Sequence, residues 1–135
     1  MASPLEVLKS AKVDKGGCIC KLISKAFTTR NLLHFAHLST KSYAAHEALG
    51  SMYDDIIDQI DGIAEVYQGQ FGLIEGLSSE SAVVPKDICE HVKQEAMWLE
   101  ANRSNIAKGS TPIENMIDEL IATYYKTIYK LENLH

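Results

Sequence analysis

Four side chains of metal-ligand type occur in the first half of the sequence: His34, His46, Asp61 and Glu65. Imidazole and carboxylate groups together suit Fe(II), Mn(II) and Zn(II). Asp61 and Glu65 are four residues apart, so on a continuous helix they share a face. His46 lies fifteen residues before Asp61, which corresponds to roughly 22 Å along a helix. The four residues are therefore either unrelated, or they meet when two antiparallel copies each lend two histidines to the carboxylates of the other.

The elements that must position these residues are indicated by apolar side chains at helical spacing. The chain has 135 residues, of which 46% are hydrophobic and 23% charged, as expected for one globular domain. We expect a first helix over residues 18–37, a second from the caps at 38–40 to about 68, a third over 85–108 and a fourth from 112 onwards. No segment alternates like a β-strand. The fold class is therefore all-α, a single four-helix bundle over residues 1–135.

The boundaries of these helices follow from a few residues. Pro85 and Pro112 are suited to first turns, and Gly109 is suited to a stop. Thr111 and Glu114 have the spacing of a capping box. Residues 1–16 would form an arm or a short helix, and residues 69–84 a long connection with room for a short helix of its own.

Composition excludes several classes of protein. The net charge of −5 argues against a broadly basic nucleic-acid binder, so DNA binding is not expected. No apolar run approaches the ~20 residues that span a membrane. The three cysteines, Cys18, Cys20 and Cys89, cannot all pair, which favours a reducing, cytoplasmic compartment. Cys18 and Cys20 lie about 200° apart around a helix, so both cannot face one ion.

An intrachain di-iron centre of the ferritin type is not expected. Such a centre takes a glutamate from each of two helices and a Glu-x-x-His pair from each of the others. The sequence has no acidic residue between Asp14 and Glu47, so the first long helix offers no carboxylate. Its only Glu-x-x-His pair is Glu132–His135, at the end of the chain. His91 shows no evident partner on a neighbouring helix, and we leave it out of the predicted site.

The segment from His34 to Glu65 resembles the core motif of Dps, the ferritin-like proteins of starved cells. The motif consists of a histidine, then His-Glu-x-Leu, then Asp-x-x-Asp-x-x-Ala-Glu. The matching residues are His34, then His46, Glu47 and Leu49, then Asp58, Asp61, Ala64 and Glu65. The chain is similar to the short, divergent Dps-like proteins that tailed phages encode.

The resemblance implies a ferroxidase site at a two-fold dimer interface. His34 and His46 would come from one subunit, and Asp61 and Glu65 from the other. The bound metal would be iron, oxidised from Fe(II) to Fe(III) by hydrogen peroxide or dioxygen, with Zn(II) or Mn(II) as alternatives. Asp58 could hold the metal ligands in place without itself binding the metal, or it could lie on the route of incoming iron. His37 could assist or replace His34. The resemblance also implies a homo-oligomer, a dimer at least. Proteins of the Dps family usually assemble into a cage of twelve subunits.

Three residues depart from the family pattern. Phe35 replaces a tryptophan, Val66 an arginine, and Gly50 an acidic residue four positions after the second histidine. Because glycine has no side chain to bind a metal, the resemblance at position 50 does not extend to a full second metal position. These departures keep an alternative open, in which the chain is a ferritin-like interaction or regulatory protein that binds a protein partner and carries a degenerate metal site.

Overall fold

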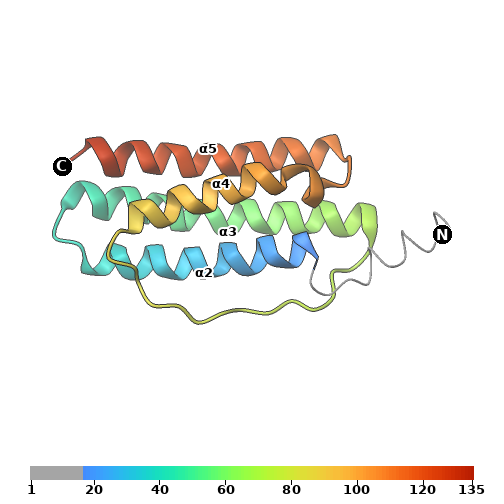
Figure 1. The fold of residues 1–135 in the computed structure, drawn as a ribbon, viewed down its shortest axis with the longest axis horizontal. Helices are drawn as coiled ribbons and strands as arrows, with labels where there is room; N and C mark the ends of the chain where they lie inside the picture. Colours follow the sequence, from blue (N-terminus) through green and yellow to red (C-terminus); the bar gives the residue numbers. More distant parts are fainter. Residues whose placement is uncertain (1–16) are drawn as a thin grey trace.

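The computed structural model describes residues 17–135, so the expectation for residues 1–16 lies outside the described residues. The helices are α2 (Cys18–Ser39), α3 (Tyr43–Phe71), α4 (Ile88–Ala107) and α5 (Thr111–Asn133). Residues 17–135 contain no strand. The prediction of an all-α four-helix bundle is confirmed for this part of the chain (Figure 1).

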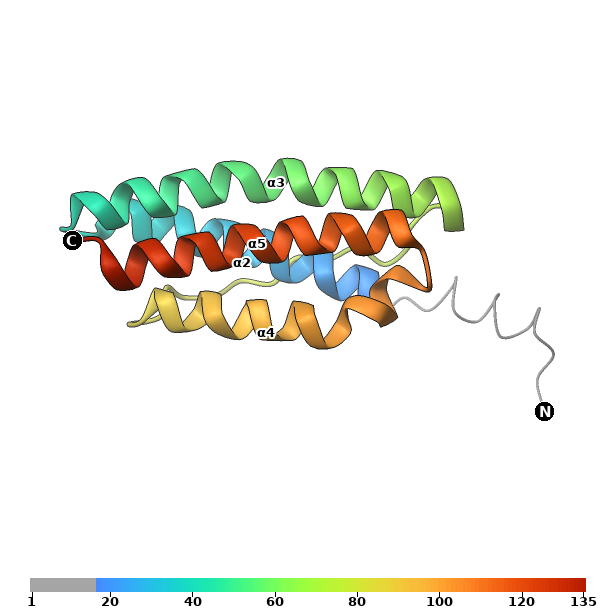
Figure 2. The ribbon, with the colours of Figure 1, turned by 90° about the horizontal axis from the view of Figure 1, so that it is seen from above.

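The helices form two antiparallel hairpins, α2–α3 and α4–α5, each closed by a short turn. Residues 72–87, which we call the crossover, run alongside α2 from the end of α3 to the start of α4 (Figure 1). As a result α3 and α4 run in the same direction. The main packing pairs are α2–α3, α3–α5, α4–α5 and α2–α4, and Figure 2 shows α5 between α3 and α4 when the bundle is viewed from above. This connectivity places the predicted ligands on one hairpin.

Apolar stripes explain why these segments become helices that pack together. In α3 six apolar residues that recur at helical spacing are each at most 5% exposed: Leu49, Met52, Ile56, Ile60, Ile63 and Tyr67. Buried apolar residues of α2, α4 and α5 complete the core. On α2, the large apolar side chain of Phe27 lies outside this core, at 39% exposed. Burial of one face leaves the opposite face of α3 for polar residues.

Several helix ends differ from the expectation. Helix α4 begins after Asp87, whose carboxylate accepts the Glu90 amide at 3.0 Å. Pro85 therefore lies in the crossover, and the predicted start of this helix at Pro85 was wrong. The cap of α5 is Ser110 rather than Thr111, because the Ser110 hydroxyl accepts the Ile113 amide. In α4 the side-chain cap rather than the proline marks the start, whereas Pro112 lies in the first turn of α5 as predicted.

The long connection between the second and third helices covers residues 72–87 instead of 69–84, because both of its ends lie three residues later than expected. It contains no helix. Helix α3 continues through Gly69 and ends at Gly72, which has a φ of +95° that favours glycine. Among the residues that the structure describes, no helix is both long and apolar enough to cross a bilayer.

Candidate metal centre

The histidines of the predicted site gather where α2 turns into α3. His34 and His37 lie in the last turns of α2, His46 lies in the first turn of α3, and all three are half-buried. The His34 ring stacks on Tyr53, with ring centroids 4.2 Å apart and planes 14° apart. The Arg30 guanidinium lies 5.2 Å from the same tyrosine ring. His34 is therefore held by aromatic contacts, next to a cation.

His37 and His46 form a reciprocal pair across the turn. The Nδ1 of His37 lies 2.6 Å from the carbonyl oxygen of His46, and the Nδ1 of His46 lies 2.8 Å from the carbonyl oxygen of His37. Their rings stack with centroids 3.6 Å apart and planes 19° apart. Because a carbonyl oxygen can only accept, each Nδ1 carries the hydrogen, and a neutral ring then has its lone pair on Nε2. Metal-binding histidines are commonly held in this way.

The carboxylates of the predicted site lie further along α3 on its outer face. Asp58, Asp61 and Glu65 are all exposed. The hydrogen bonds and ion pairs found within residues 17–135 involve none of these three carboxylates. The sequence has no lysine or arginine from residue 42 to residue 85. The outer face of α3 is thus an acidic surface, and α3 itself contains no lysine or arginine to balance it.

The two groups of ligands do not meet within one chain. His46 and Asp61 lie on the same continuous helix, so about 22 Å separates them along its axis. His34 stacks on Tyr53, which precedes Asp61 by eight residues, or about 12 Å. In the described part of the chain, no three histidine, cysteine, aspartate or glutamate side chains converge as a metal site would require. A site made of all four residues would need a second copy of the chain.

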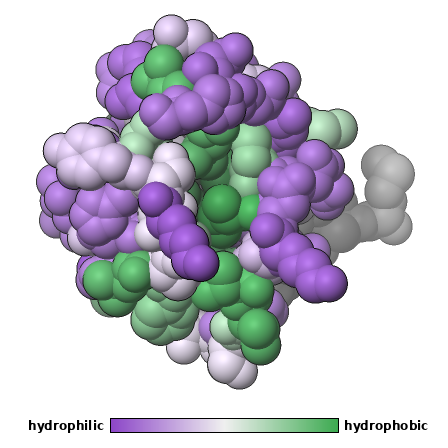
Figure 3. Space-filling view, turned by 90° about the vertical axis from the view of Figure 1, so that its left-hand side faces the viewer, coloured by the Kyte–Doolittle hydropathy of each residue, from purple (hydrophilic) through white to green (hydrophobic). Residues whose placement is uncertain are grey.

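Apolar side chains surround the histidine group. Phe35 is 52% exposed, Leu38 69% and Tyr43 77%. Figure 3 shows this end of the molecule, where hydrophobic surface gathers in the lower half and hydrophilic surface covers most of the rest. Large exposed apolar side chains in one region are typical of an interaction surface.

His91 has a partner that sequence reasoning missed. Its Nε2 lies 3.0 Å from the hydroxyl of Thr29 on α2, a fully buried residue. Glu95 lies one turn further along α4, 3.8 Å from the imidazole, and also binds Lys25. Burial lowers the pKa of His91, Glu95 opposes that shift, and Lys25 adds to it. The expectation that His91 has no partner was wrong, because α2 and α4 pack directly against each other.

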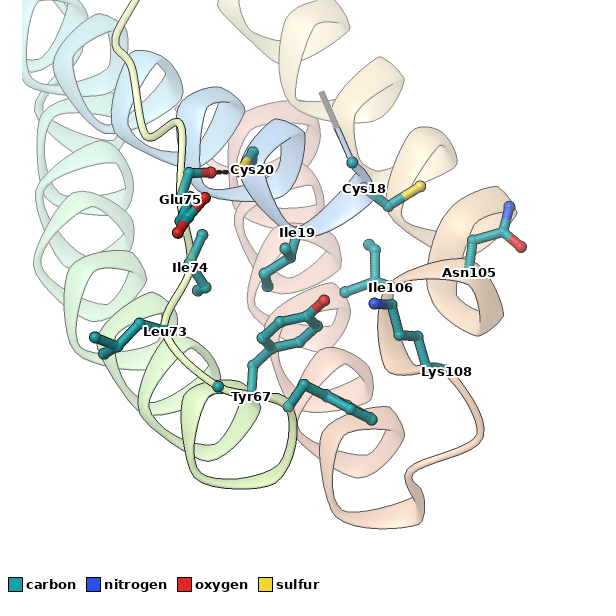
Figure 4. Close-up of a pocket in the computed structure, with 13 residues that line it drawn as sticks. Cys18, Ile19, Cys20, Tyr67, Leu73, Ile74, Glu75, Asn105, Ile106 and Lys108 are labelled. Atoms are coloured by element: carbon teal, nitrogen blue, oxygen red, sulfur yellow. Dashed lines mark hydrogen bonds between the residues drawn. The ribbon is translucent and has the colours of Figure 1, made fainter. Parts of the chain in front are cut away.

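A cavity of about 190 Å³ lies at the opposite end of the bundle (Figure 4). Cys18 and Cys20 both border it but point to different sides of α2. The Cys20 thiol donates to the carbonyl oxygen of Glu75, and the Cys18 thiol faces Asn102. The prediction that these two cysteines cannot face one ion is confirmed.

Comparison with known proteins matches residues 37–131, more than two thirds of the chain, to the family of unknown function DUF5856. The chain belongs to DUF5856. The matched segment contains His37, His46, Asp61 and Glu65, and His34 precedes it.

One relative of this DUF5856 chain is an uncharacterized 14.6 kDa protein from the mobD-ri intergenic region of Enterobacteria phage T4. It is 29% identical over 99 residues, which cover 73% of this chain and 75% of the relative. No solved structure matches the chain. Neither description states an activity or a ligand.

Proposed function

We propose that this protein is a Dps-like, ferritin-like iron-binding protein whose sites form between two copies of the chain. In each site His34 and His46 of one copy face Asp61 and Glu65 of the other. Fe(II) is the substrate, and each ion gives up one electron. Hydrogen peroxide, one of the two oxidants that the resemblance implies, would accept two electrons, one from each of two Fe(II) ions, and two protons to form two water molecules.

The observation that carries this proposal is the arrangement of the ligands in two groups on the outside of one hairpin. A buried intrachain centre would need ligands from several helices pointing inward. Here the imidazoles of His34 and His46 are half-buried at the turn, and the carboxylates of Asp61 and Glu65 are exposed further along α3. An isologous two-fold contact between the α2–α3 hairpins of two copies would bring the histidines of each copy against the carboxylates of the other.

Three further features support the proposal. Bundles with one long crossover include the ferritin-like folds, and the crossover here joins α3 to α4. The carboxylates of Asp61 and Glu65 take part in none of the ion pairs found within residues 17–135, and Fe(II) would supply them with a positive charge. The exposed side chains of Phe35, Leu38 and Tyr43 border the histidines and give a second copy apolar surface to bury.

The first test is an anaerobic titration of the metal-free protein with Fe(II), followed by addition of peroxide. We expect saturable binding of a small whole number of irons per chain and fast oxidation, both lost in His46→Ala. Asp54→Asn serves as the control, because Asp54 is exposed on the same helix and is not a predicted ligand. Absence of saturable binding in the wild type would overturn the proposal.

A mixing experiment tests whether the site is shared. His46→Ala alone and Asp61→Ala/Glu65→Ala alone should each lack functional sites. In a mixed dimer, however, one of the two sites takes wild-type histidines from one chain and wild-type carboxylates from the other. After random exchange of subunits, about a quarter of the wild-type sites should return. No recovery in dimers shown to be mixed would contradict a shared site.

The second candidate function is binding of a protein partner by a ferritin-like scaffold with a degenerate metal site. The exposure of Phe35, Leu38 and Tyr43 favours it, because a partner other than a second copy could cover the same surface. A protein that remains monomeric at micromolar concentration and binds no Fe(II) would support this candidate over the first.

A further inference from the structure

The reciprocal bonds between His37 and His46 close the turn between α2 and α3 from both sides. The carbonyl of His37 lies in the last turn of α2, where main-chain carbonyls lack a helical partner. The His46 imidazole donates to this carbonyl at 2.8 Å. In return, the His37 imidazole donates to the carbonyl of His46 at 2.6 Å. Each histidine thus fixes the position of the other through its main chain as well as its ring.

Gly50 makes the second of these bonds possible. In a regular helix the carbonyl of His46 also accepts the amide of residue 50, one turn later. The His37 ring must therefore approach this carbonyl right beside residue 50. A Cβ atom at Gly50 would lie 3.0 Å from Cε1 and 3.1 Å from Nδ1 of His37. Such contacts are tighter than ordinary van der Waals packing, so with any other residue at position 50 the His37 ring would have to give way by a few tenths of an ångström.

The bonds have a chemical consequence for His46. Free imidazole exchanges its hydrogen between two nitrogens, but the bond to the His37 carbonyl keeps the hydrogen on Nδ1. The lone pair of neutral His46 is then held on Nε2, and stacking on the His37 ring restricts rotation of the side chain. Hydrogen bonds of this kind orient metal-bound histidines, and their loss typically weakens metal binding by about 10- to 100-fold.

We propose that His37 is a positioning residue that prepares His46 to bind the metal, and that Gly50 provides the space in which it does so. His37 acts through its carbonyl and its ring, without itself binding the metal. This inference rests on the proposed iron-binding function. It also gives a physical reason for the glycine at position 50, where the Dps pattern has an acidic residue.

The test compares two glycine-to-alanine variants on the same helix. Gly50→Ala crowds the His37 ring, which must shift by a few tenths of an ångström, whereas a Cβ at Gly69 meets nothing within 4 Å. Both changes replace a helical glycine with alanine. We expect Gly50→Ala to weaken anaerobic Fe(II) binding by about 10-fold, the lower end of the range for loss of such support, because it disturbs the stacking of the His37 ring on His46 but leaves the His37 carbonyl in place. Gly69→Ala should leave the binding unchanged. Equal affinities in both variants would overturn the inference.

A double-mutant cycle ties the effect to His37. His37→Ala should weaken Fe(II) binding to the same extent as Gly50→Ala, and adding Gly50→Ala to His37→Ala should cause no further loss. If the two losses instead multiplied, Gly50 would act independently of His37 and the inference would be wrong.

Imidazole ¹⁵N spectra separate positioning from ligation and from a purely structural role. In the metal-free wild type, His46 should carry its hydrogen on Nδ1. In Gly50→Ala the main-chain carbonyl of His37 is still present, so the hydrogen should stay on Nδ1, but the His46 ring signals should change because the His37 ring no longer stacks on it in the same way. With Zn(II) as a diamagnetic probe, Nε2 of His46 should shift and Nε2 of His37 should not. A metal-dependent shift of His37 Nε2 would make His37 a ligand and overturn the inference.

The metal-free spectra also distinguish this inference from the proposed function. A His46 held in the Nδ1–H form by His37, in a protein that binds no Fe(II), would leave the positioning in place and remove the iron function. Conversely, iron binding by a wild type whose His46 exchanges freely would keep the function and remove the positioning.

Discussion

His46 and His91 are both held by a hydrogen bond from a neighbouring helix, yet the two bonds have opposite consequences. His91 uses Nε2, the nitrogen at the tip of the ring, to contact the buried Thr29. His46 uses Nδ1, the nitrogen near the main chain, to contact a carbonyl, which leaves Nε2 available. The comparison suggests that the nitrogen engaged by the fold separates a structural histidine from a candidate ligand.

The largest expected difference is in metal affinity. His46→Ala removes a proposed ligand and should weaken Fe(II) binding by at least about 100-fold, more than loss of a supporting hydrogen bond does. His91→Ala should leave the affinity within about 2-fold, because the contacts of His91 are with Thr29 and Glu95, which are not proposed ligands. Anaerobic titration of both variants checks this. Equal losses would mean that His91 belongs to the metal site and that the comparison fails.

The next effect concerns stability rather than binding. Thr29→Val keeps the shape of a fully buried side chain but removes the partner of His91 Nε2, and of the buried Tyr124 phenol beside it. A buried polar group without a partner costs about 1–3 kcal/mol, so the free energy of unfolding should fall by that amount. Urea denaturation measures it. Fe(II) affinity should not change, and a large change would link the two histidines.

The pH dependence of stability should come partly from His91. Its pKa is lowered in the folded protein from an ordinary value of 6.5, so the unfolded chain takes up a proton first as the pH falls. The stability contributed by neutral His91 is therefore complete above pH 6.5 and is lost progressively below it. Urea midpoints measured from pH 7.5 to pH 5 should fall more steeply for the wild type than for His91→Gln. Parallel curves would show that His91 is not held neutral by its surroundings.

The smallest effect on stability is expected at the carboxylates of the predicted site. Asp61→Asn with Glu65→Gln removes repulsion between two like charges one turn apart on the exposed face of α3. Metal-free protein should become slightly more stable, by about 1 °C in Tm, while Fe(II) binding is lost. A calorimetric scan without metal decides the sign. A drop in Tm would show that these carboxylates have partners that stabilise the fold.

The helical bundle could be predicted because apolar residues at helical spacing give each helix one face to bury. The stripe from Leu49 to Tyr67 is periodic over five turns, and all of it is buried. The helix ends were less predictable, because Asp87 and Pro85 are both reasonable start signals. Only the local geometry of the chain decides between a cap and a proline two residues earlier.

The contacts within the candidate site were only partly predictable. The spacing of His46, Asp61 and Glu65 was enough to show that one chain cannot bring them together. The stacking of His37 on His46 was not predictable, because it depends on how α2 and α3 are rotated about their axes. One signal was available, since a glycine inside a helix usually needs a packing reason, and Gly50 is such a glycine.

The crossover has a practical consequence for work on this protein. Residues 75–83 are all exposed, and of this stretch the hydrogen bonds to the helices involve the carbonyls of Glu75 and Glu80. Lengthening such a connection carries a small entropic cost, about 0.6 kcal/mol for each doubling. An epitope tag or a small fluorescent peptide inserted near Ser78 would therefore be tolerated. It would report on assembly while leaving the outer face of α3 uncovered.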